Sequence, residues 1–193
     1  MTFSQEVGRK SIHLASGLIP IAYWFIPKGI FLPLIAVLAV GTVVVDYSRH
    51  RVHWVGVAFN AVFGFVLREH ENDSRALTGG STVMISQVLA VALFPKPIAV
   101  ASLLILSVGD TAAALVGRAI GRHTVYGDKT WEGTAAFLLF SAAAASLVPG
   151  IPIYAALLAA GTASLVEVFL DSVDDNLFIP VVGGVILFLL LGS

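Results

Sequence analysis

The feature that most constrains the fold is a succession of apolar runs along nearly the whole chain. A helix needs about 20 residues to cross the roughly 30 Å hydrocarbon core of a bilayer. Runs of that order occupy residues 11–27, 29–46, 77–95, 97–119, 133–149, 151–170 and 177–192. Only 12% of the residues are charged, about half of what soluble domains carry. We therefore predict an all-α fold, a polytopic transmembrane bundle of about seven spans, as one membrane domain over residues 1–193.

A further apolar run, Val52–Leu67, is too short for the same role. Its 16 residues would reach about 24 Å, and it contains His53 and Asn60. We expect an interfacial or half-buried helix there. The first run follows basic residues as in a signal peptide, but small-residue cleavage chemistry is absent, so we expect a retained first span.

Basic residues set the expected orientation, because cytoplasmic loops of membrane proteins carry an excess of lysine and arginine. With the N-terminus inside, Lys28 and Lys96 fall on the outer side. The nine others fall on the cytoplasmic side: Arg9, Lys10, Arg49, Arg51, Arg68, Arg75, Arg118, Arg122 and Lys129. We therefore predict a multi-pass membrane protein with a cytoplasmic N-terminus and a cytoplasmic active site.

Charge and cysteine content exclude several kinds of site. The formal net charge is −1, and no basic run suggests a surface for nucleic acid. The chain has no cysteine, which excludes disulfides, thiolate nucleophiles and cysteine-ligated metals. A metal ion would therefore be held by oxygen or histidine.

Asp110 lies within an apolar run, about 20 Å along a helix that starts at Pro97. An ionised carboxylate at that depth costs at least about 2.5 kcal/mol unless it is paired, hydrated or metal-bound. The preceding segment Ser107–Gly109 could break the helix, so that a half-helix starts at Asp110 and opens a hydrated notch. We expect a functional carboxylate, and the alternative is a structural cap of that half-helix.

Small residues line one face of the helix after Asp110. Ala114, Gly117 and Gly121 follow Asp110 at spacings of four, seven and eleven residues, which places them on one side. Close helix packing is the commoner explanation for such a face. The alternative is that a nucleotide approaches the bare backbone.

Lys129 and Thr130 stand immediately before the helix expected from Trp131. The spacing does not match a Walker A motif. A lysine, a hydroxyl and the free amides of a helix start nevertheless favour a phosphate. The alternative is a positive-inside anchor.

Carboxylates follow near the cytoplasmic ends of the last helices. We select Glu132, Glu167 and Asp175 as ligands for a hard cation, and expect Asp171 and Asp174 to lie in a solvated loop. Mg²⁺ takes few protein carboxylates together with phosphate oxygens and water, so this sparse set suits a nucleotide-bound ion.

The amino-terminal half supplies further polar groups. Arg9, Lys10 and His13 share one side of the first helix, which suggests an anion. Asp46 and Arg49 are three residues apart and favour a local ion pair. The second cytoplasmic loop adds Arg68, His70 and Glu71.

In this order the segments resemble the family of CTP-dependent lipid-alcohol kinases, which includes dolichol, phytol and farnesol kinases and a fungal CTP-dependent diacylglycerol kinase. The matching segments are Arg9-Lys-x-x-His13, Asp46-x-x-Arg49, Leu67-Arg-x-His-Glu71 with Leu77-Thr-Gly79, Gly109-Asp-x-x-Ala113 through Gly117 and Gly121, Lys129-Thr-x-Glu-Gly133, and Glu167 followed by Asp175-Asn-x-x-x-Pro180.

The resemblance implies transfer of the CTP γ-phosphate to the hydroxyl of a membrane lipid alcohol, with Mg²⁺ or a similar divalent cation. We favour an isoprenoid acceptor of the polyprenol, dolichol or phytol type. Segment 107–133 would form the nucleotide site on the cytoplasmic side. The implied catalytic residues are Asp110, Lys129 and Glu132, with Asp110 as general base or metal ligand. The implied nucleotide contacts are Lys129, Thr130, Gly117, Gly121, Arg68, Lys10 and Asn176. The implied metal ligands are Asp110, Glu132, Glu167 and Asp175. Residues of second rank are His13, Asp46, Arg49 and Glu71.

Two other functions remain open at this point. A CTP-dependent cytidylyltransferase that makes a CDP-lipid would need the same metal and phosphate contacts, but would release pyrophosphate. A small transporter could use Asp110 and Glu167 to carry protons or cations. Many transporters are built from inverted repeats, and the sequence shows no such repeat.

Overall fold

The computed structural model describes residues 2–67, 77–170 and 175–192, and almost all of them are helical. The helices are α1 Phe3–Ser16, α2 Leu18–Phe25, α3 Lys28–Ser48, α4 His53–Phe63, η1 Gly64–Val66, α5 Gly79–Leu93, α6 Lys96–Leu104, η3 Ile105–Gly109, α7 Asp110–Ile120, α8 Trp131–Ser146, α9 Ile153–Phe169 and α10 Asp175–Leu191. The expected all-α class is confirmed.

Two helical stretches of the described chain are long and apolar enough to cross a membrane: Lys28–Ser48, and the continuous stretch Lys96–Ile120. The remaining apolar runs form helices of at most 17 residues. The expected number of about seven spans is therefore not established by helix length and composition.

The first apolar run forms two successive helices rather than one. The break falls at Gly17, between α1 and α2. A Cβ atom at Gly17 would lie 2.7 Å from Ser107 Oγ and 3.0 Å from the Leu14 carbonyl oxygen. A side chain at Gly17 would therefore press on Ser107 of η3 and on the last turn of α1.

The stretch around Ser107–Gly109 is irregular, as expected, but it does not break. Ile105–Gly109 forms a π-helix inside one continuous helix, and α7 starts directly at Asp110. The expectation of a separate half-helix that starts at Asp110 is therefore wrong, because the helix continues through this stretch. π-turns inside α-helices occur frequently at functional sites.

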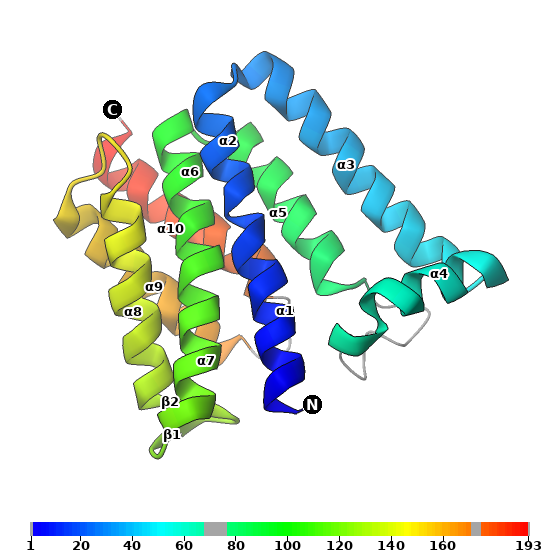
Figure 1. The fold of residues 1–193 in the computed structure, drawn as a ribbon. Coiled ribbons are helices and arrows are strands. Elements are labelled where there is room, and N and C mark those ends of the chain that lie inside the picture. Colours follow the sequence, from blue (N-terminus) through cyan, green and yellow to red (C-terminus); the bar gives the residue numbers. More distant parts are fainter. Residues whose placement is uncertain (1, 68–76, 171–174, 193) are drawn as a thin grey trace.

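A short antiparallel hairpin joins α7 to α8, and the sequence interpretation did not anticipate it. Strand β1 covers Thr124–Tyr126 and pairs with β2, Lys129–Thr130. Gly127 in the connecting turn has a φ of 51°, a conformation that glycine adopts without steric cost. The hairpin lies at the lower end of α7 in Figure 1 and carries Lys129 in its second strand.

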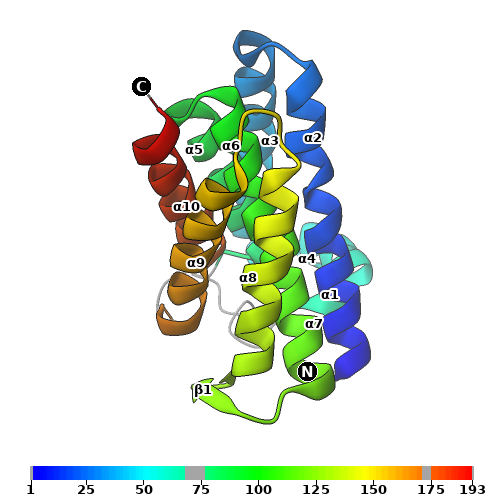
Figure 2. The ribbon, with the colours of Figure 1, turned by 90° about the vertical axis from the view of Figure 1, so that its left-hand side faces the viewer.

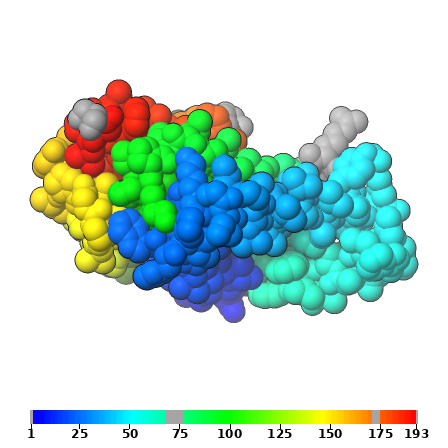
Figure 3. Space-filling model, turned by 90° about the horizontal axis from the view of Figure 1, so that it is seen from above, coloured from blue at the N-terminus to red at the C-terminus, as the bar shows by residue number. Residues whose placement is uncertain are grey.

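The bundle is built from α1, α2 and α5–α10, with the first part of α3 packed against it along α5, while the end of α3 and α4 extend outward as an arm (Figures 1 and 3). Helix α9 packs between α8 and α10 (Figure 2). The inward side of α9 is a row of fully buried alanines: Ala155, Ala156, Ala159, Ala160 and Ala163. Small residues at these spacings let helices approach closely, as is common in membrane bundles.

Large apolar side chains lie on the outer surface of the same helices. Examples with more than half of their surface exposed are Val37 and Val40 on α3, Leu139 on α8, Leu165 on α9 and Leu189 on α10. A soluble monomer rarely exposes apolar patches of such extent. Alanine inside and leucine or valine outside is the arrangement expected of a bundle whose solvent is lipid.

Candidate functional site

Asp110 lies at the centre of the buried polar cluster. Its Oδ2 atom accepts a hydrogen bond of 2.5 Å from Lys10 Nζ and lies 3.2 Å from His13 Nε2. All three residues are less than 9% exposed. The carboxylate caps no helix, because Gly109 holds the N-cap position of α7 without a side-chain bond. The structural-cap alternative is therefore wrong, and Asp110 pairs across to α1.

Helix α1 presents its basic residues in two directions. Lys10 and His13 are one turn apart and face Asp110, whereas Arg9 turns to Glu6, with Nη2 2.5 Å from Oε1. Arg118 Nη2 lies 3.8 Å from the other Glu6 oxygen. The expectation that all three basic groups share one anion is not met in this geometry. Glu6, which is 4% exposed, was missed, although its three-residue spacing to Arg9 was a readable signal.

Lys129 and Glu167 form a second pair, in which the carboxylate is buried and the lysine is partly exposed. Its ammonium group donates a hydrogen bond to Glu167 Oε1, which joins the hairpin to α9. Although burial lowers the pKa of Lys129, the Glu167 carboxylate raises it, with support from Asp175 and Asp110, and the net result is a raised pKa. Lys129 therefore stays fully charged at neutral pH, as a phosphate ligand must.

The two pairs belong to one electrostatic system. The Asp175 carboxylate, at the start of α10, and the Asp110 carboxylate both help to raise the pKa of Lys129. The next residue, Asn176, is buried and its Nδ2 atom donates to Thr82 Oγ1 at 3.4 Å. Residues far apart in the sequence therefore surround one polar interior formed by α1, α7, β2, α9 and α10.

Thr130 and the small residues of α7 hold this interior together. Thr130 is the N-cap of α8, and its Oγ1 atom accepts from the Gly133 amide at 3.2 Å. A Cβ atom at Gly117 would lie 3.2 Å from Thr130 Oγ1, and one at Gly133 would lie 2.9 Å from the Ala113 carbonyl oxygen. The small face is thus a contact between α7 and α8, as the commoner explanation predicted. A nucleotide role for Gly117, Gly121 and Thr130 stays a prediction.

Glu132 faces the hairpin. His123 Nδ1 lies 2.7 Å from Glu132 Oε1, and the His123 amide donates to Oε2 at 3.4 Å. The His123 side chain, followed by backbone amides, lowers the pKa of Glu132 to about 2. In the described parts of the chain, no three histidine or carboxylate side chains are grouped closely enough to hold a metal ion. The four expected metal ligands are therefore not gathered into one site.

Asp46 connects the arm to the bundle. Its Oδ2 atom accepts from the Thr78 amide at 2.8 Å and from the Thr78 hydroxyl at 2.9 Å, at the N-terminus of α5. Arg49 Nε lies 3.7 Å from Asp46 Oδ1, which confirms the expected local ion pair. The expected residues Arg68, His70, Glu71, Asp171 and Asp174 lie outside the described residues.

Comparison with known proteins adds two relatives. The uncharacterized protein RP860 of Rickettsia prowazekii is 33% identical over 120 residues, which are 62% of this chain and 59% of that protein. The chain thus covers less than two thirds of that relative. The CTP-dependent diacylglycerol kinase 1 of Schizosaccharomyces pombe is 32% identical over 161 residues, 73% of each chain. No protein-family model and no solved structure matches the chain.

Proposed function

The chain belongs to the family of CTP-dependent lipid kinases, and on this premise we propose that it transfers the γ-phosphate of CTP to the hydroxyl group of a membrane lipid alcohol. The observation that carries the proposal is the buried cluster of Lys10, His13, Asp110, Lys129 and Glu167 on four elements. Buried ionisable residues in an apolar bundle are expensive and mark functional sites by default. The order of motifs in the sequence supports the same family.

Lys129 is the proposed phosphate ligand. Its side chain keeps 27% of its surface exposed while its partner Glu167 keeps 4%, so the ammonium group can turn to an incoming anion. Phosphoryl transfer depends mainly on positioning and on neutralising phosphate charge. A permanently charged lysine at the rim of the cluster suits that role. Thr130 and Asn176 are proposed as further nucleotide contacts, whereas Lys10 is held by Asp110.

Asp110 is the proposed general base. In the reaction, a bond forms between the lipid hydroxyl oxygen and the γ-phosphorus, and the bond from that phosphorus to the β,γ-bridging oxygen breaks, so that CDP leaves. The hydroxyl proton passes to the Asp110 carboxylate. Lys10 and His13 hold that carboxylate in place, and its depth in the bundle suits a hydroxyl group that arrives from the membrane.

A divalent cation such as Mg²⁺ fits the donor chemistry in part. Mg²⁺ is held by one or two carboxylates together with substrate phosphates and water, and Glu167 and Asp175 both act on Lys129. We propose these two carboxylates as its protein ligands when the nucleotide is bound. The ion would neutralise phosphate charge. Glu132 is engaged with His123 instead.

We propose a multi-pass arrangement with the N-terminus and the reaction site at the cytoplasmic side. The support is the exposed apolar surface of α3, α8, α9 and α10, together with the excess of basic residues at one end of the expected spans. Helices shorter than about 20 residues can still cross where the bilayer thins or neighbouring segments complete the span.

The proposed acceptor is an isoprenoid alcohol of the polyprenol, dolichol or phytol type, as the sequence resemblance implies. The yeast relative is named for diacylglycerol, so both acceptor classes belong in one assay. Purified protein is incubated with Mg²⁺, γ-labelled CTP and polyprenol, phytol, geranylgeraniol or diacylglycerol, and the lipids are extracted.

Label in an organic-soluble lipid monophosphate, with CDP in the aqueous phase, is the expected result and names the acceptor. If phosphatidic acid is supplied in place of the alcohols, labelled pyrophosphate together with a CDP-lipid would replace the kinase by a cytidylyltransferase. Protein that is folded but does not bind CTP would reopen the transport function.

A further inference from the structure

A second charged region lies on the arm, at the turn between α3 and α4. It is a cavity of about 430 Å³ lined by Arg49, His50, Arg51, His53, Gly56, Val57 and Asn60. This cavity, which we call the arm pocket, shares no lining residue with the cluster around Asp110. Figure 1 shows the arm projecting from the bundle on the side away from α8 and α9.

The turn of the chain shapes the arm pocket. A Cβ atom at Gly56 would lie 2.6 Å from the Arg49 carbonyl oxygen, so glycine lets α4 cross close above the end of α3. His53, Gly56, Val57 and Asn60 are spaced by three, four and seven residues, which places them on one face of α4. The same face therefore carries the polar residues of α4 toward the basic end of α3.

The side chains at the arm pocket favour an anion. Both arginines are stacked on aromatic rings, Arg49 on Phe59 at 4.8 Å and Arg51 on Tyr47 at 3.7 Å. None of the described lining residues is acidic. The Asp46 carboxylate pairs with Arg49 through Oδ1 and accepts two hydrogen bonds from Thr78 through Oδ2, so Arg49 is already engaged. The basic residues that stay exposed at this lining are His50, Arg51 and His53.

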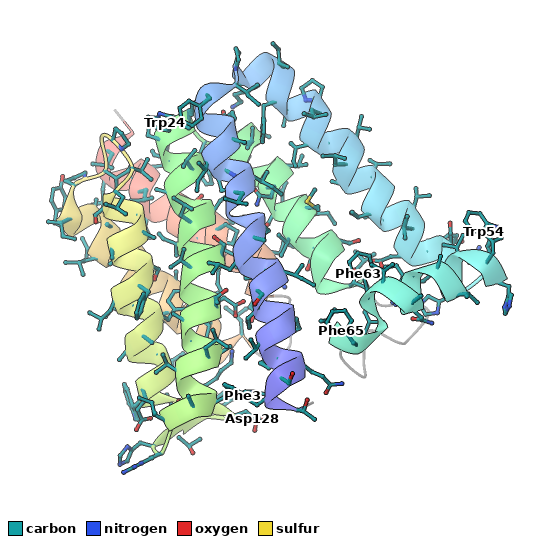
Figure 4. All side chains as sticks on the ribbon, viewed as in Figure 1. Phe3, Trp24, Trp54, Phe63, Phe65 and Asp128 are labelled. Carbon is teal, nitrogen blue, oxygen red and sulfur yellow. The ribbon has the colours of Figure 1, made fainter. Side chains whose placement is uncertain are left out.

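The other faces of α4 are apolar and exposed. Trp54 is 73% exposed and Phe65, just beyond the helix, is 55% exposed, and α4 buries none of its residues. Figure 4 labels Trp54, Phe63 and Phe65 along this arm. A short helix with exposed tryptophan and phenylalanine, next to arginines on the preceding turn, is typical of the interface of a bilayer.

The position of the arm pocket along the chain points to the same environment. Arg49, His50 and Arg51 directly follow α3, which is long and apolar enough to cross a membrane. Basic residues at the end of a span stand at the level of the lipid phosphates. We propose that the arm pocket binds the phosphate group of an anionic phospholipid, with α4 lying in the bilayer interface. This site is additional to the phosphoryl-transfer site.

The test measures lipid binding without CTP, so its outcome is independent of the kinase proposal. Detergent-purified protein is titrated with dihexanoylphosphatidylglycerol, dihexanoylphosphatidylcholine or inorganic phosphate, and bound lipid is counted by native mass spectrometry. We expect the anionic lipid to bind at least fivefold more tightly than the zwitterionic one. Inorganic phosphate at the same concentration should not displace it, because phosphate lacks the acyl chains that α4 would contact.

A matched pair of variants assigns the site. Arg51→Gln removes an exposed cation at the arm pocket, and Arg122→Gln removes an exposed cation near the hairpin. One basic group near an anionic lipid surface contributes about 1 kcal/mol, so Arg51→Gln should weaken binding about fivefold and Arg122→Gln should not. Equal binding of both lipids by the unmodified protein, displacement by inorganic phosphate, or equal loss in both variants would each overturn the proposal.

Discussion

The two lysine–carboxylate pairs of the interior differ in how far they are closed to solvent. In the inner pair, the side chains of Lys10 and Asp110 are 2% and 7% exposed. In the rim pair, the Lys129 side chain is 27% exposed and Glu167 only 4%. The inner pair is closed on both sides, whereas the rim pair is closed on the carboxylate side alone. The difference indicates that the inner lysine positions a carboxylate and the rim lysine is available to a ligand.

The comparison has an energetic side as well. Removing one partner of a fully buried pair leaves an uncompensated charge and costs about 3–5 kcal/mol. A partly exposed lysine that loses its partner can turn to water, so its loss of a partner costs less. The two pairs should therefore respond differently to the same kind of substitution.

The largest effect is expected for Asp110→Asn. The substitution removes the proposed base and leaves Lys10 buried without its counter-charge. Turnover should become undetectable, and the free energy of unfolding should fall by about 3 kcal/mol. Lipid phosphorylation and denaturant unfolding in detergent measure the two effects separately.

A double variant separates chemistry from folding in that result. Lys10→Met combined with Asp110→Leu removes both charges, and replacing a buried ion pair by apolar residues is often neutral or stabilising. The double variant should therefore recover stability without recovering turnover. Recovered turnover would remove Asp110 from the mechanism.

Substitution of the rim lysine should weaken the use of CTP. Lys129→Ala should lower kcat/KM for CTP by at least about 100-fold, in the range of a lost electrostatic contact in the transition state, and should raise the KM for CTP. Glu167→Gln leaves Lys129 free to turn to water, so it should destabilise the fold less than Lys129→Ala, which strands a buried carboxylate. An unchanged KM for CTP in Lys129→Ala would contradict the comparison.

A smaller effect is expected where α7 meets α8, because that contact holds both pairs in register. Gly133→Ala would place a Cβ atom 2.9 Å from the Ala113 carbonyl oxygen. Overpacking of this kind typically costs about 1–3 kcal/mol. Gly41→Ala on α3 is the matched control, since a Cβ atom there meets nothing within 4 Å. Equal melting temperatures for the two variants would show that the contact is looser than the structure indicates.

The sequence predicted the helices well because apolar runs of helix length are a local property. It predicted irregular backbone at Ser107–Gly109 but not that this backbone forms a π-helix within a continuous helix, and it missed the break at Gly17, where the chain contacts Ser107. That contact joins residues about 90 positions apart, and no local pattern encodes it.

The sequence predicted which single residues belong to the site, but not which of them pair with each other. Asp110, Lys10 and Lys129 stood out because charge is rare in this chain, yet their partners are set by tertiary packing. Glu167 was expected at a metal ion and is found at Lys129. The pairing of His123 with Glu132 was missed because the hairpin that brings them together was not anticipated.

The pair of His123 and Glu132 is the most exposed of the three pairs and should contribute least to stability. The His123 side chain is 76% exposed, and its hydrogen bond lowers the pKa of Glu132 from 4.5 to about 2. A carboxylate with a lowered pKa in the folded state stabilises the fold above pH 4.5 and loses that contribution as the pH falls toward 2. His123→Gln should therefore lower the melting temperature slightly at pH 6, and the difference from the unmodified protein should shrink below pH 4.5. A difference that stays constant down to pH 3 would mean that His123 stabilises the hairpin through some contact other than the Glu132 carboxylate.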